Sequence, residues 1–224
     1  TSSTNCSTAN WTPTNAVPAI DKCVLVNRLV IISTGRNFEA KNGQVVHGGT
    51  VTINNDASLK IRDYLRNNAA ATAVLIQSDG NLIQVNEGVN INTGSVTAKR
   101  TLNLSTGRLE YNYLISPLEG QTLKDIYTAA GAVAPVVLYH NETSNRFSAS
   151  SGAYIKGRGL AVKEPTTAFV PTTLNTTFTG KPTNGAFTYN VVNSNPTDTN
   201  RGYNLVGNPY PSNIDMLTFY TVNG

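Results

Sequence analysis

Three stretches of the chain resemble one another: Ser33-Thr34-Gly35-Arg36-Asn37-Phe38-Glu39-Ala40, Asn55-Asp56-Ala57-Ser58-Leu59-Lys60-Ile61-Arg62 and Ser78-Asp79-Gly80-Asn81-Leu82-Ile83-Gln84-Val85. Each begins with a polar turn and a small residue and continues with alternating residues. With Thr34, Asp56 and Asp79 taken as equivalent, the repeat steps by 22 and then 23 residues, from position 34 to 56 and from 56 to 79. This period is typical of a β-helix or another solenoid, in which each coil buries its apolar face by stacking on its neighbours.

Short apolar segments continue this pattern on both sides. They recur at 24–26, 29–32, 49–53, 74–76 and 82–85. Alternation of apolar and polar residues with a period of two indicates half-buried β-strands. We therefore expect β-solenoid-like coils over residues 24–104, in about three to four rungs.

The second half of the chain has a different pattern, with longer strands separated by loops rich in Pro and Gly. Segments 111–115, 136–139 and 187–191 are typical of strands, and 123–127 fits a short amphipathic helix. We expect residues 105–224 to form an antiparallel β-module that continues beyond residue 224. The predicted fold is thus all-β: a short β-helix or solenoid-like N-terminal part, followed by an antiparallel β-sandwich or jelly-roll-like module.

Residues 1–23 are polar and contain both cysteines of the chain, Cys6 and Cys23. Their spacing is not that of a metal site, and a disulfide between them would stabilise the fold by about 3 kcal/mol on the loop-closure model. We expect a disulfide-pinned cap over residues 1–23 and an oxidising compartment. The alternative is a pair of buried free thiols.

The composition limits the classes of partner. Charged residues make up 13% of the chain, and the net charge of +4 comes from scattered basic residues. A nucleic-acid-binding protein normally concentrates its basic residues in one stripe, so we expect no nucleic-acid partner. No apolar run is long enough to span a membrane, so we expect no membrane span.

Candidate catalytic and metal-binding residues are few. The two histidines, His47 and His140, are far apart in sequence and show no metal-ligand spacing. Asp56 and Asp79 occupy equivalent positions in the repeat and could bind calcium through their carboxylates, or could simply form the turns. We expect no catalytic residue and no cofactor, apart from the calcium alternative at these two aspartates.

Near the C-terminus, Gly207-Asn208-Pro209-Tyr210-Pro211-Ser212-Asn213-Ile214-Asp215 places a tyrosine between two prolines. Proline fixes the backbone, and a cis bond is plausible at Tyr210-Pro211. We interpret this segment as an architectural corner that packs Tyr210, and not as a functional site.

Several phrases of the chain resemble a known group of proteins. They are Gly157-Arg158-Gly159-Leu160-Ala161-Val162-Lys163, Phe178-Thr179-Gly180-Lys181-Pro182-Thr183-Asn184-Gly185, Gly202-Tyr203-Asn204-Leu205-Val206-Gly207-Asn208-Pro209-Tyr210-Pro211-Ser212, Val96-Thr97-Ala98-Lys99-Arg100 and Tyr111-Asn112-Tyr113-Leu114-Ile115-Ser116-Pro117. They are similar to phrases of large secreted surface proteins of Bacteroidetes. The resemblance implies export by the type IX secretion system through a sorting domain beyond residue 224, and it implies no catalytic residue.

These observations lead to an expectation about function. We expect a non-enzymatic secreted or cell-surface protein of adhesin or fibre-building type, located outside the cell or on its outer surface. Its ligand would be a surface, a carbohydrate held on exposed tyrosines, or a second copy of the chain. The alternative is an accessory or catalytic module that acts on extracellular polysaccharide.

Overall fold

The structure is a computed structural model that describes residues 19–103, 111–129, 135–163 and 173–223. Its strands form three sheets. The first is parallel, in the order β1 (Cys23–Val26), β3 (Asn37–Val45), β5 (Ser58–Asn67), β7 (Asn81–Gln84). The second runs β2 (Leu29–Ile32), β4 (Thr50–Ile53), β6 (Val74–Ile76), β8 (Val96–Asn103), β14 (Thr173–Pro182), β10 (Leu118–Glu119). The third is antiparallel, in the order β12 (Arg146–Ala149), β11 (Val136–Asn141), β13 (Leu160–Lys163), β9 (Asn112–Leu114). The helical elements are η1 (Ala71–Ala73), α1 (Leu123–Ala129) and α2 (Met216–Asn223).

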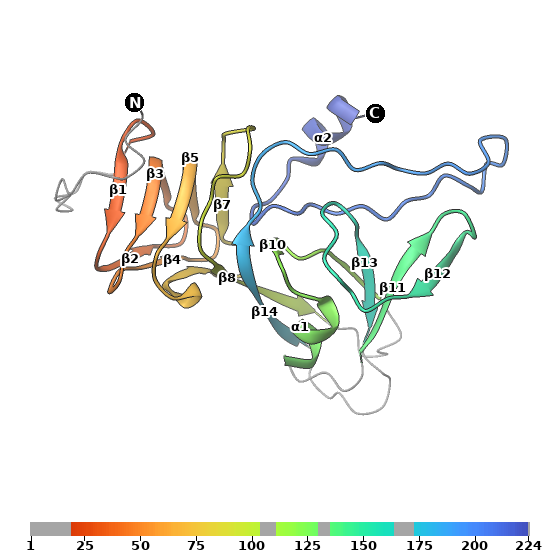
Figure 1. Cartoon of the computed structure of the whole chain (residues 1–224), viewed down its shortest axis with the longest axis horizontal. Helices are drawn as coiled ribbons and strands as arrows, with labels where there is room; N and C mark the ends of the chain where they lie inside the picture. Colours follow the sequence, from red (N-terminus) through yellow and green to blue (C-terminus); the bar gives the residue numbers. More distant parts are fainter. Residues whose placement is uncertain (1–18, 104–110, 130–134, 164–172, 224) are drawn as a thin grey trace.

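The predicted solenoid is confirmed, as about three turns over residues 23–98 followed by the antiparallel four-stranded sheet (Figure 1). The repeat differs from the prediction at one position. Gly35, Asp56 and Asp79 are the residues with left-handed φ values of 74°, 56° and 63° at successive corners. The equivalent residue in the first repeat is therefore Gly35 and not Thr34. The corner requires a positive φ, which is unfavourable for a β-branched residue such as threonine.

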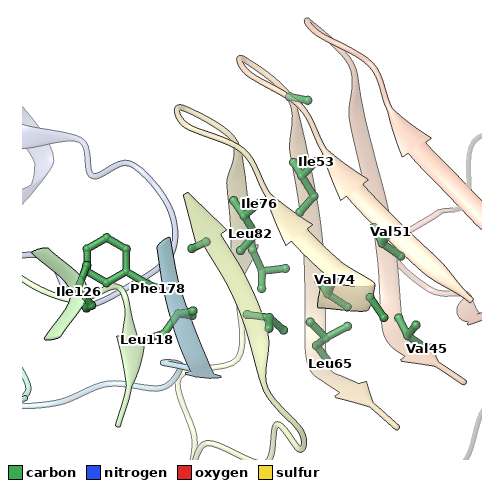
Figure 2. Close-up of a cluster of buried hydrophobic side chains, with 14 of the residues drawn as sticks. Val45, Val51, Ile53, Leu65, Val74, Ile76, Leu82, Leu118, Ile126 and Phe178 are labelled. Atoms are coloured by element: carbon green, nitrogen blue, oxygen red, sulfur yellow. The ribbon is translucent and has the colours of Figure 1, made fainter. Parts of the chain in front are cut away.

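The core of the solenoid is a set of side-chain ladders between its two sheets (Figure 2). Ile32, Ile53 and Ile76 stand in register on neighbouring strands, followed by Ala98 and Phe178, and each of these residues is at most 1% exposed. Burying one such isoleucine contributes about 1.5–3 kcal/mol. The ladder continues into β14, so one hydrophobic core runs from the solenoid into the second half of the chain.

Asn92 lies at the end of the parallel sheet, where the loop after β7 completes the last coil. Its Oδ1 accepts the main-chain N–H of Leu65 at 2.8 Å and the Nε2 of Gln84 at 2.8 Å. Its Nδ2 donates to the Oε1 of Gln84 at 2.7 Å and to the carbonyl of Pro182 at 3.1 Å. These bonds satisfy a side chain that is almost fully buried. The stack therefore ends on a closed amide network.

The second half of the chain is joined to the solenoid by shared sheet. Strand β14 pairs antiparallel with β8 from Thr173–Asn103 to Gly180–Val96, and β10 pairs with β14. Helix α1 buries Leu123, Ile126 and Tyr127, as the sequence predicted. The sequence did not predict that β14 extends a sheet of the solenoid, because β14 and β8 lie far apart in the chain.

Two expectations from the sequence are wrong. The segment 187–191 is not a strand, and no cis peptide bond occurs in the described part of the chain, Tyr210-Pro211 included. The predicted cap lies largely outside the described residues. Cys23 begins β1, whereas Cys6 is not among the residues described, so the Cys6–Cys23 disulfide stays a prediction. No helix of the described ranges is long and apolar enough to cross a membrane.

Candidate functional site

A cleft of about 610 Å³ opens where the solenoid meets the second half of the chain. One side comes from the corner at Ser78–Asp79 and from β8, through Arg100, Thr101 and Leu102. The rest of the lining comes from β9 and the loop after it, from Phe178 on β14, and from the segment 205–214. Five separate parts of the sequence thus form one concave surface, and its volume lies within the range of small-molecule binding sites.

Two glycine-containing motifs hold the segment 205–214 in place. Gly159 N–H donates to the carbonyl of Leu205 at 2.9 Å, and Gly207 N–H donates to the carbonyl of Gly157 at 3.0 Å. A Cβ on Gly207 would lie 2.7 Å from the side chain of Ile115, so only glycine lets the segment approach the residue after β9 this closely. The motifs at 157–163 and 202–212 are therefore one packed unit.

The segment around Tyr210 is anchored at both ends. The Tyr210 hydroxyl donates to the carbonyl of Gly185 at 2.6 Å, and Asn208 Nδ2 donates to the carbonyl of Ser212 at 2.6 Å. The Leu82 N–H donates to the carbonyl of Pro211 at 2.8 Å, which attaches the segment to the free edge of β7. This geometry agrees with the predicted architectural corner and gives the cleft a fixed wall.

Arg100 and Asp79 place opposite charges in the cleft. Burial lowers the pKa of the half-buried Arg100 guanidinium, and the charge of Asp79 partly opposes that shift. Arg100 Nη1 donates to the carbonyls of Lys99 at 2.8 Å and Gln77 at 3.5 Å. The exposed Asp79 carboxylate receives no hydrogen bond from any described residue and forms no ion pair with Arg100. Both groups retain hydrogen-bonding capacity toward a ligand.

The rest of the lining is largely aromatic and aliphatic. Tyr113 is 62% exposed on β9, and Leu102, Ile115 and Val206 line the same cleft. A second cleft of about 460 Å³ lies along β7 and the turn at 183–186. Tyr210 and Ser212 line both clefts, so the anchored corner forms part of the wall of each.

The candidate metal residues have separate surroundings. Asp56 and Asp79 each form a left-handed corner, as the turn alternative predicted, but only Asp79 lines the cleft. Across the described ranges, no group of three or more His, Cys, Asp or Glu side chains could hold a metal ion. Calcium binding by the two aspartates stays a prediction.

Sequence reasoning missed the cleft and most of its residues. Lys99-Arg100 appeared only within a phrase that carries the resemblance, and Tyr113 only within another such phrase and a predicted strand. A signal did exist in the glycines and prolines at 157–159 and 207–211, which are spaced for close backbone packing. This signal indicated that the two segments pack together, but not that their packing forms a cleft.

The chain belongs to a family described as a domain of unknown function (DUF8693), which matches residues 1–224. No curated protein and no solved structure matches the chain.

Proposed function

We propose that this family member is a non-enzymatic secreted or cell-surface protein of adhesin type, and that its ligand binds in the 610 Å³ cleft. The observation that carries the proposal is the construction of the cleft. Its walls come from paired strands and an anchored corner, so they are held in place before a ligand arrives. Preformed walls reduce the entropy cost of binding.

The charges of the cleft favour binding over cleavage of a polysaccharide. Glycoside hydrolysis generally needs two carboxyl groups on either side of the scissile bond. Asp79 is the only Asp or Glu among the described residues that line the cleft. The alternative, a catalytic module acting on polysaccharide, would need a second acidic group that these residues do not supply.

A specific observation also favours binding to a second copy. Strand β2 ends the second sheet and pairs only with β4 among the described strands. Its outward residues Leu29 and Ile31 are 66% and 50% exposed. An apolar strand at an open edge can accept a strand from another chain, which would extend the sheet between molecules.

The remaining parts of the proposal concern location. Export by the type IX secretion system, an extracellular or outer-surface location and the Cys6–Cys23 disulfide rest on the resemblance and on the paired cysteines. They predict that the protein is found outside the cell and gains free thiols only on reduction.

Binding and cleavage can be tested together. The purified chain is incubated with insoluble polysaccharides and with intact cell surfaces, and bound protein and released sugar are both measured. Retention without sugar release supports the proposal. Sugar release that is lost on Asp79→Asn would show an enzyme and overturn it.

A further inference from the structure

We infer that the cleft binds a neutral saccharide chain, an inference that rests on the proposed function and names its ligand. The argument begins with charge. Arg100 alone would suit a phosphate or a carboxylate, and Asp79 alone would suit an amine. Because both line the same cleft and Asp79 is close enough to act on Arg100 electrostatically, each repels the ligand that the other attracts.

A hydroxyl group satisfies both residues. Arg100 offers only donors and the ionised Asp79 offers only acceptors, whereas a sugar hydroxyl can donate and accept at once. The two side chains share the cleft without an ion pair between these described residues, so neither neutralises the other by direct contact. Neighbouring hydroxyls of one ring therefore match this arrangement without adding a net charge.

The apolar residues of the cleft lining suit the face of a sugar ring that carries no hydroxyls. Tyr113 presents an exposed aromatic ring, and Leu102, Ile115 and Val206 line the same cleft. A pyranose has a face of C–H groups that packs on aromatic and aliphatic surface, and its hydroxyls remain at the ring edge. The cleft thus combines the two kinds of contact that a neutral saccharide requires.

The repeat supplies a matched control for the charge argument. Asp56 and Asp79 are both exposed and both have left-handed φ values, but Asp56 does not line the cleft. Asparagine tolerates this backbone conformation, so Asp56→Asn and Asp79→Asn should fold equally well. Tyr220, which is 71% exposed on α2, is the corresponding control for Tyr113.

The test measures binding of soluble neutral polysaccharides (a glucan, a mannan and a xylan) and acidic ones (polygalacturonate and alginate) by titration calorimetry. We expect neutral chains to bind and acidic chains not to bind. Asp79→Asn and Tyr113→Ala should each weaken binding by about tenfold, the loss expected for one charged hydrogen bond or one stacked ring, while Asp56→Asn and Tyr220→Ala leave it unchanged.

Other results would overturn the inference. Binding of acidic chains alone would show that the ligand is not a neutral saccharide. Equal losses of affinity in the cleft variants and their controls would show that the ligand binds outside the cleft. If no polysaccharide binds but the protein still attaches to cells, the inference fails and the proposed function stands. If it neither binds polysaccharide, attaches to cells nor self-associates, both fail.

Discussion

The carboxylate of Glu142, which is 5% exposed, accepts the main-chain N–H of Gly202 at 2.9 Å although the two residues lie on different segments. The same carboxylate accepts the N–H and the hydroxyl of Ser194, each at 3.1 Å. One acidic side chain after β11 therefore fastens both ends of the loop between 194 and 202.

These hydrogen bonds, called the Glu142 clasp below, predict a pH dependence of stability. Burial raises the pKa of the Glu142 carboxyl, but the hydrogen bonds from Gly202 and Ser194 and the charge of Arg201 outweigh it and hold the pKa below its ordinary value of 4.5. A pKa that is lower in the folded state adds stability above pH 4.5, and this stability is lost as the pH falls through the folded value. Glu142→Gln should therefore be less stable at neutral pH and should lose less stability on acidification. Urea unfolding at neutral pH and at about pH 3 measures both.

The control for this prediction is Glu39→Gln, which removes a partly exposed carboxylate paired with Lys60 on the solenoid surface. Its curve should follow that of the wild type closely, because exposed ion pairs contribute little. Equal pH profiles for wild type and Glu142→Gln would contradict the Glu142 clasp.

The close packing of β14 against β10 predicts that one methyl group added at Gly180 destabilises the fold. A Cβ on Gly180 would overlap the carbonyl oxygen of Glu119 on the paired strand. Gly180→Ala should therefore lower the free energy of unfolding by about 2 kcal/mol or more, because backbone cannot move aside as a side chain can. Gly35→Ala meets no atom within 4 Å and should cost only about 1 kcal/mol, for its left-handed φ. Thermal or urea unfolding of both variants gives the comparison, and equal losses would argue against the clash.

Removing the Asn92 amide from the network at the end of the stack should lower the free energy of unfolding more than removing an exposed amide. Asn92→Ala leaves the buried N–H of Leu65 and the half-buried amide of Gln84 without their partner, so we expect a loss of about 2–4 kcal/mol. Asn86→Ala removes one bond to a neighbouring main-chain N–H and should cost about 1 kcal/mol or less. Chemical unfolding measures both values, and a loss at Asn92 no greater than at Asn86 would show that the network adds no stability.

The open edge of β2 predicts how the protein associates. Ile31→Lys puts a charge on an exposed apolar strand and should suppress self-association while changing monomer stability by no more than about 0.5 kcal/mol. Light scattering at increasing protein concentration measures the effect, with Val222→Lys on the exposed helix α2 as the control. A wild type that stays monomeric, or an Ile31→Lys variant that still associates, would rule out this edge.

The sequence predicted the solenoid because its coils are local. The strands are indicated by alternating apolar and polar residues at 49–53 and 58–62, with polar corner residues between them. The position of Thr34 was misjudged by one residue because Thr34 and Gly35 are both plausible turn residues, and only the backbone angle separates them.

Distant pairing was beyond the same reasoning. The segment 187–191 has the alternating pattern of a strand, but this region is held by contacts with side chains and not by pairing with another strand. Phe187 packs 5.9 Å from the ring of Tyr210 and 4.7 Å from Lys156 Nζ, and Asn204 bonds Val192 with its amide. The cleft could not be read from the sequence for the same reason, since Arg100 and Tyr113 meet the segment 205–214 only in the folded chain.

The antiparallel pairing of β14 with β8 also sets an order of assembly. Paired strands of neighbouring coils are separated by about 20 residues in sequence. Val96 pairs with Gly180, which lies much further along the chain, so this pairing closes a far longer loop. Non-local contacts of this kind form late and slow the final step of folding. We expect the coils to form first, from short loops, and the ligand cleft to be completed only when the last third of the chain closes over them. An arrested chain would therefore display a finished stack with an uncovered β8 edge, a state that is open to pairing with another molecule.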